Sequence, residues 1–176
     1  MVAIYDEILK KCQLYFKNDG VAPSLEYYEK ALTTIDNSEN QAKYISFLKE
    51  LLEYCRKNHD FENEAVVLRA LGRTHSVFKH HYESLNYHRE ALKIQRKLGR
   101  KLEIAESLEL IAESLEFNEK YDECIKTYKN AADMFHELGK LRKERDLRKE
   151  ISRIEAFSRD IIQDEYYLKK FRLNID

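Results

Sequence analysis

The sequence predicts an all-α fold, an α-solenoid of stacked antiparallel helical hairpins, and three observations support this. The chain has 176 residues with only 1 proline and 4 glycines, so few helix breaks are expected. Apolar residues recur at helical spacing along almost its whole length. A central stretch also repeats itself at a shift of forty residues, and a fixed period near this length is typical of stacked helical hairpins.

The internal repeat covers residues 65–140. Adding forty to a residue number keeps apolar positions apolar and small positions small. The first copy carries Leu68, Leu71, Gly72, Ser84, Ala91, Leu98 and Gly99, and the second carries Leu108, Ile111, Ala112, Cys124, Ala131, Leu138 and Gly139. We therefore expect one domain, residues 1–176, with regular units at 65–104 and 105–144. Degenerate helices precede them at 1–64, and capping helices follow at 141–173.

Within each unit, the spacing indicates two helices packed against each other. Leu68, Leu71 and Gly72 fall on one face of a helix at positions i, i+3 and i+4. Ser84 and Ala91 fall on one face of a second helix, after a short polar turn. The small residues let two helix backbones approach closely, while large apolar side chains fill the space around them.

These residues resemble the tetratricopeptide repeat. The family pattern of Leu-Gly, a small residue, an aromatic residue and Ala is matched in each unit by Leu71, Gly72, Ser84, His88 and Ala91, then by Ile111, Ala112, Cys124, Tyr128 and Ala131. The period is similar to that of the longer variant in kinesin light chains, Pins-type polarity scaffolds and bacterial Rap-type peptide sensors. The resemblance implies a right-handed solenoid whose first helices line a concave, partner-binding face.

Two positions depart from the family pattern. The early Trp of the family is replaced by Leu68 and Leu108, which is a substitution within the core. The mid-helix Asn is replaced by Arg73 and Glu113. The residue that clamps a ligand's backbone in many relatives is therefore absent from this sequence.

Composition and charge narrow the classes of function. Charged residues make up 36% of the chain, which suits the large surface of an elongated stack. The net charge of −1 gives no general attraction to nucleic acid, and no apolar run approaches the length of a membrane span. Residues 1–10 lack the features of a secretory signal, and the 3 separated cysteines fit neither a disulfide framework nor a metal knuckle. We expect a reducing, cytoplasmic location, no cofactor, no nucleic-acid partner and no membrane insertion.

About nine helices are expected, with starts near residues 3, 22, 40, 61, 81, 101, 121, 141 and 161. Asn18-Asp19-Gly20 ends the first helix, because Gly adopts the left-handed conformation that closes a helix. Pro23 suits the first turn of the second helix, where its missing N–H costs little. Ser38 and Asp60 are suited to cap the helices that follow them.

The flanking helices have apolar faces that we expect to point inward. Their residues are Ile4, Ile8, Cys12, Tyr15 and Phe16; Leu25, Tyr28, Ala31 and Leu32; Tyr44, Phe47, Leu48, Leu51, Leu52 and Cys55; Leu147, Ile151, Ile154 and Phe157; and Ile161, Ile162, Tyr166, Leu168 and Phe171. The charged C-terminal helices are interpreted either as a solvated cap of the stack or as docking helices for a partner.

The pairing of the first four helices has two interpretations. The segment Tyr28–Leu32 resembles the second helix of a unit, as His88–Leu92 does. Counting back from the regular units in steps of twenty makes the same segment part of a first helix. We favour counting back, because stacking in repeat proteins is continuous between neighbours.

Charged residues also recur at intervals of forty. One series is Arg69, Glu109 and Lys149, preceded by Glu29, and the other is Arg73, Glu113 and Arg153. On stacked first helices, opposite charges would meet and form an ion-pair ladder along the concave face. Such a ladder either serves structure alone, at about 0–1 kcal/mol per exposed pair, or selects an extended peptide or partner helix of matching charge. Both interpretations stay open at this point.

Other residue types that can carry chemistry are better explained by packing. Three histidines of the first unit replace apolar or aromatic residues of the second: His75 for Leu115, His81 for Tyr121 and His88 for Tyr128. They are therefore interpreted as packed residues rather than metal ligands. Tyr44 and Tyr128 fall at core spacing, which favours packing over nucleic-acid stacking. Cys124 fills a small core position and is expected to be inert.

The sequence thus predicts a non-catalytic scaffold or adaptor that binds a partner peptide or helix on its concave face. No nucleotide-binding loop, zinc-protease motif or nucleophile elbow is present in the sequence. The predicted contact residues are Arg69, Arg73, Val77, Glu109, Glu113, Phe117, Lys149 and Arg153, with Val77 and Phe117 as apolar anchors. The alternatives are a Rap-like regulatory sensor of a short signalling peptide and a self-assembling protein that forms a homo-oligomer through its C-terminal helices.

Overall fold

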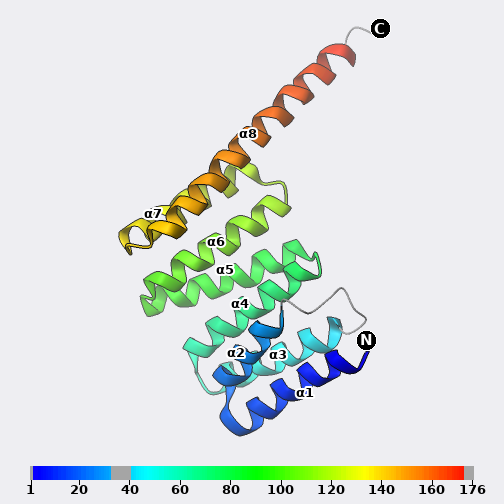
Figure 1. The fold of residues 1–176 in the computed structure, drawn as a ribbon, viewed down its shortest axis with the longest axis vertical. Helices are drawn as coiled ribbons and strands as arrows, with labels where there is room; N and C mark the ends of the chain where they lie inside the picture. Colours follow the sequence, from blue (N-terminus) through cyan, green and yellow to red (C-terminus); the bar gives the residue numbers. More distant parts are fainter. Residues whose placement is uncertain (1, 33–40, 173–176) are drawn as a thin grey trace.

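The computed structural model describes residues 2–32 and 41–172, and it describes side chains at residues 7–32 and 41–161. Within these ranges the chain forms eight α-helices and no strand, so the predicted all-α class is confirmed (Figure 1). The helices are α1 (Val2–Asp19), α2 (Val21–Leu32), α3 (Gln41–Lys57), α4 (Phe61–Val77), α5 (His81–Leu98), α6 (Lys101–Phe117), α7 (Tyr121–Glu137) and α8 (Leu141–Arg172). The predicted cap Ser38 and the predicted inward side chain of Ile4 lie outside the described ranges, as do the side chains of Ile162, Tyr166, Leu168 and Phe171.

The helices follow one another through the molecule in chain order. Each helix from α3 to α7 packs against the next, and α1 packs against α2. In Figure 1 the N-terminal helices lie at one end of the stack and α8 lies at the other. Buried side chains between neighbours form two hydrophobic clusters, one built mainly from α1 to α4 and the other mainly from α6 to α8. The arrangement is a helical repeat-like fold.

Five turns, spaced twenty residues apart, share one hydrogen-bond geometry. Each contains a residue with positive φ after the helix, and these residues are His59, Lys79, Gly99, Glu119 and Gly139. The N–H of the following residue donates to the carbonyl five positions earlier, at 2.8 to 3.1 Å. This combination is the Schellman motif, which satisfies carbonyl groups at the end of a helix. Because the turns are equivalent and evenly spaced, successive helices leave them in a similar way and stack regularly.

The predicted starts of the central helices are confirmed. Four helices begin twenty residues apart, at Phe61, His81, Lys101 and Tyr121. Asp60 caps α4 as predicted, because its Oδ1 accepts a hydrogen bond from the Asn63 N–H at 3.1 Å.

The predicted ninth helix is wrong, because α8 continues through the expected break near residue 161. This helix runs for 32 residues without Gly or Pro, the residues that most strongly end a helix. Ser158 and Arg159 both donate side-chain hydrogen bonds to the Glu155 carbonyl, at 3.4 and 3.0 Å, without interrupting the helix. As a result, the second half of α8 extends well beyond the other helices (Figure 1).

Counting back in steps of twenty is supported only in part, because it places α2 beside α4, whereas α2 and α3, which it makes one hairpin, do not pack closely within the described residues. The hydroxyl groups of Tyr28 in α2 and Thr74 in α4 share a buried hydrogen bond of 2.7 Å. The ring of Phe16 in α1 meets the ring of Tyr54 in α3 edge-on, with centroids 5.1 Å apart. Thus α2 lies beside α4, and α1 lies beside α3.

Most of the predicted inward residues are buried, including all six of α3. Two of the predictions are wrong. Tyr15 is 40% exposed and lies against Tyr27 at the surface. Phe157 is 49% exposed because it lies level with Tyr121, the first residue of α7, where the packing of α8 on α7 ends.

α4 and α5 approach each other closely at Gly72. A Cβ atom built at this position would lie 2.6 Å from Nδ1 and 2.7 Å from Nε2 of the His88 ring, which is only 1% exposed. The corresponding pair in the second unit, Ala112 and Tyr128, is buried as well. The small residue in each unit therefore makes room for the buried ring of the following helix, as the spacing predicted.

Candidate partner-binding groove

A groove of about 620 Å³ crosses the face formed by α4 and α6. We call it the central groove, and its lining residues are Leu32, Arg69, Arg73, Ser76, Val77, His88, Glu106, Glu109, Leu110, Glu113, Ser114 and Lys143. Half of these residues are charged, three as cations and three as carboxylates. The central groove is therefore strongly polar but carries no net charge.

Ion pairs cross between neighbouring helices along this face. The pairs and their shortest distances are Arg69–Glu106 at 3.0 Å, Arg73–Glu29 at 3.5 Å and Lys143–Glu109 at 2.9 Å. They join α4 to α6, α2 to α4 and α6 to α8. A ladder of opposite charges thus exists, although each pair is partly exposed to water and contributes only about 0–1 kcal/mol to stability.

The predicted pairing at intervals of forty residues is wrong in register. Long side chains lean towards the N-terminus of their own helix. Arg69 accordingly pairs with Glu106, one turn before Glu109, whereas Glu109 pairs with Lys143, six residues before Lys149. The forty-residue spacing correctly predicts which helices lie side by side, but it does not predict which charged groups meet between them.

Five of the eight predicted contact residues line the central groove, namely Arg69, Arg73, Val77, Glu109 and Glu113. They come from α4 and α6, the two first helices of the regular units. The prediction that residues forty apart share one face is therefore correct for these helices.

The remaining three predicted residues lie outside the groove lining. Phe117, the last residue of α6, is 62% exposed and stacks on His81, with ring centroids 4.3 Å apart. His81, the first residue of α5, therefore lies at the end of α6, where the turn to α7 begins. Lys149 is exposed and lies 4.0 Å from Asp146, while Arg153 pairs with Glu116 and Glu150, each at 2.7 Å. The predicted apolar anchor Phe117 thus lies beside the turn between α6 and α7, outside the central groove.

The spacing of charged residues did not predict seven of the lining residues, namely Leu32, Ser76, His88, Glu106, Leu110, Ser114 and Lys143. Glu106 and Leu110 lie one turn before and one residue after predicted positions of α6, so the helical wheel carried a signal for them. Lys143 had a weaker signal, because its contact depends on the lean of Glu109.

Glu113 is the unusual carboxyl group of the groove. It makes no hydrogen bond or ion pair within the described part of the chain, and its side chain is open to water on one side. Partial burial and the neighbouring Glu109 raise its pKa, while Arg73 and Lys143 act in the opposite direction. Glu113 is therefore the groove carboxylate that is left to accept a hydrogen bond or a positive charge from a ligand.

His88 forms part of the wall between α4 and α5. Burial lowers its pKa to about 3, with smaller contributions from Arg69 and Arg73. The ring is therefore neutral at physiological pH, and its Nδ1 has no hydrogen-bond partner in the described structure. This supports the interpretation of His88 as a packed residue that gives the groove a rigid wall.

Other groups that could carry chemistry are buried singly. Among the described residues, no group of three or more His, Cys, Asp or Glu side chains is arranged to hold a metal ion. Cys12, Cys55 and Cys124 are buried thiols, and burial raises their pKa values to about 12, 11 and 12. At neutral pH these thiols are protonated and poorly nucleophilic. Within the described residues, no helix is both long and apolar enough to cross a membrane.

The sequence shows no similarity to known proteins that would identify this site. No protein-family model matches this sequence, and no curated protein is significantly similar to it.

Proposed function

We propose that this protein is a non-catalytic scaffold or adaptor that binds a peptide or helix of a partner protein in the central groove. In this proposal the helical stack is a right-handed α-solenoid similar to tetratricopeptide repeats, and its first helices form the contact face. The observation that carries the proposal is a mixed-charge groove, lined by several neighbouring helices, in which Glu113 makes no hydrogen bond or ion pair with the described residues.

The charges of the groove favour a ligand with both basic and acidic side chains. Glu113 can accept a hydrogen bond from a Lys or Arg of the ligand, and such charge-assisted bonds are stronger than neutral ones. Arg73 is half-exposed and its ion pair with Glu29 is long, at 3.5 Å, so its guanidinium can be shared with an acidic ligand residue. Complementary charges of this kind select the partner and set its register more than they add affinity.

A selection from random linear peptides tests this proposal. Peptides enriched on the wild-type protein are measured against Arg73→Glu and Glu113→Arg, which reverse charges in the groove. The control is Lys126→Glu, an equally large charge change at an exposed position of α7 outside the groove.

We expect both groove variants to weaken binding at least about tenfold, which corresponds to about 1.4 kcal/mol, while the control binds as the wild type does. Circular dichroism of each variant checks that the helical fold is retained. If the selected peptides bind all three variants equally, or if no peptide is enriched, the groove is not a peptide site.

A further inference from the structure

The second half of α8 stands apart from the rest of the fold. α8 packs mainly on α7, and among the described side chains the last ring contact between them joins Tyr121 and Phe157. Residues 158–172 continue the helix for about 22 Å at 1.5 Å per residue. Figure 1 shows this segment extending past every other helix. We call residues 158–172 the projecting segment.

The sequence of the projecting segment is divided into an acidic half and a basic half. Its first half carries Asp160, Asp164 and Glu165 against one basic residue, Arg159, and its second half carries Lys169, Lys170 and Arg172. Starting from Phe157, just before the segment, every fourth and then third residue is Ile161, Asp164, Leu168 and Phe171. All of these positions except Asp164 are apolar. This spacing is typical of a helix that pairs with another helix along one seam.

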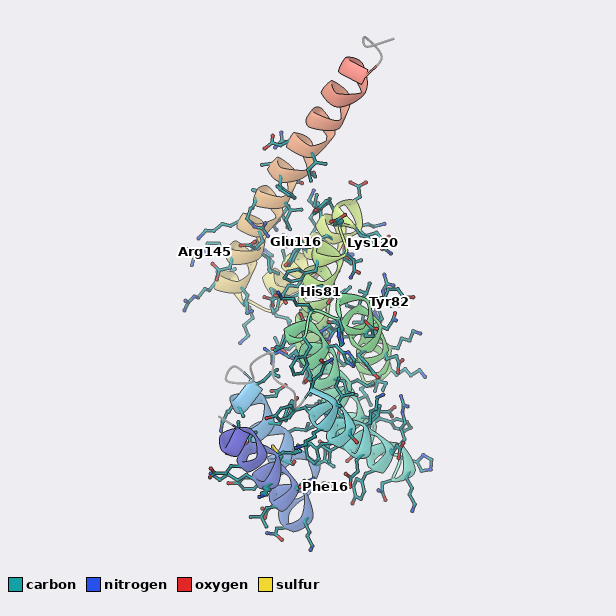
Figure 2. The ribbon with its side chains drawn as sticks, turned by 90° about the vertical axis from the view of Figure 1, so that its right-hand side faces the viewer. Phe16, His81, Tyr82, Glu116, Lys120 and Arg145 are labelled. Atoms are coloured by element: carbon teal, nitrogen blue, oxygen red, sulfur yellow. The ribbon has the colours of Figure 1, made fainter. Side chains whose placement is uncertain are left out.

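The base of the projecting segment carries a hollow with an excess of negative charge. The hollow measures about 300 Å³ and is lined by Glu119, Lys120, Tyr121, Asp122, Glu123, Ser158 and Ile161. Three of these residues are acidic and one is basic. Two exposed rings lie near this hollow: Phe157, 49% exposed, contacts Tyr121, and Phe117, 62% exposed, ends α6 just before the turn that carries Glu119 and Lys120. Lys120, labelled in Figure 2, marks this hollow below the point where α8 rises beyond the stack.

We propose that this surface is covered by a second copy of the same chain, with the two projecting segments packed antiparallel. An antiparallel pair places the acidic half of each segment against the basic half of the other, whereas a parallel pair would set like charges side by side. The basic end of each segment then reaches the acidic hollow of its partner. The contact is the same on both copies, as a two-fold dimer requires.

The length of the segment determines how strong this association can be. Fifteen residues make about two heptads, fewer than the three or four that usually sustain a coiled coil. The seam alone is therefore weak, and the contact at the hollow adds to it. We infer a reversible dimer whose population depends on protein concentration.

Charge exchange between two variants tests the antiparallel arrangement. The all-acidic variant carries Lys169→Glu, Lys170→Glu and Arg172→Glu. The all-basic variant carries Asp160→Lys, Asp164→Lys and Glu165→Lys. Both change a segment that lies outside the packed stack. Lys93→Glu with Lys97→Glu on α5 serves as the control, because both lysines are exposed and distant in sequence from α8.

Sedimentation velocity over a concentration series measures self-association. We expect the wild type and the control to dimerise alike, and each segment variant alone to dimerise at least about tenfold more weakly, because like charges then meet. An equimolar mixture of the two variants should recover dimerisation to within about threefold of the wild type. A monomeric wild type, unchanged self-association of either variant, or failure of the mixture to recover would each overturn the proposal.

Discussion

The substitution Gly72→Ala tests how tightly α4 and α5 are packed. A methyl group at this position would lie 2.6 and 2.7 Å from the two nitrogens of His88, far inside van der Waals contact. His88 is 1% exposed and cannot move into solvent. Overpacking of a tight core costs about 1–3 kcal/mol, and the number of close ring atoms argues for the upper end of that range.

Helix propensity acts in the opposite direction at the same site. Replacing Gly by Ala in a helix interior contributes about 1 kcal/mol of stability. The expected net result is a loss of about 2 kcal/mol in the free energy of unfolding, measured by urea denaturation at pH 7 with circular dichroism. In a His88→Ala background the clash is absent, so the same Gly72→Ala change should stabilise by about 1 kcal/mol. The coupling between the two positions is then about 3 kcal/mol.

The matched control is Ala112→Gly, the reverse change at the same position of the second unit. Ala112→Gly should lower the free energy of unfolding by at least about 1 kcal/mol, because Gly has a lower helix propensity than Ala and a buried methyl group is lost. A more stable Gly72→Ala protein, or equal effects of Gly72→Ala with and without the His88 ring, would refute the tight packing described for this pair.

Two further predictions concern the turns and the buried histidine. Lys79 and Glu119 hold positive φ values of 62° and 59° at turn positions where Gly99 and Gly139 occupy the equivalent sites. Lys79→Gly and Glu119→Gly should each stabilise the protein by about 0.5–1 kcal/mol, measured by thermal or urea unfolding. Gly99→Lys should destabilise it by a similar amount. Stabilisation by Gly99→Lys would contradict the turn geometry. The pKa of His88 in the folded protein, about 3, lies below the ordinary value of 6.5. The contribution of the neutral ring to the free energy of unfolding is therefore complete above pH 6.5 and is lost as the pH falls towards 3. Between pH 7 and pH 5 the free energy of unfolding of the wild type should fall by about 2 kcal/mol more than that of His88→Asn. His75 and His81 titrate in both proteins, so they do not account for the difference. An equal loss in both proteins would show that the His88 ring is accessible to protons.

Much of the fold was predictable because its signals are local and repeated. The turns after α3 to α7 recur every twenty residues, so the repeat fixes where α4, α5, α6 and α7 begin. The length of α8 was harder to predict, because the twenty-residue spacing of the earlier helix starts was extended to residue 161. The sequence from Leu141 to Arg172 contains no Gly or Pro that would end the helix there.

The groove was predictable at the level of helix faces but not of individual contacts. Repeat spacing correctly grouped Arg69, Arg73, Glu109 and Glu113, since equivalent positions on α4 and α6 face the same way. It could not predict the Arg69–Glu106 contact, which depends on the lean of a long side chain. It also assigned Phe117 to the groove, although a residue at the very end of a helix is placed by the adjoining turn.

The equivalence of the five turns has a consequence for how chains of this kind can change in length. Excising residues 101–140 would join Arg100 to Leu141, so the Gly99 turn would lead into α8 just as it now leads into α6. Duplicating the same stretch would insert one more hairpin and lengthen the central groove by one helix. A change of twenty residues would instead exchange the inner and outer rows of helices downstream, so growth or shrinkage of the stack should proceed in whole hairpins.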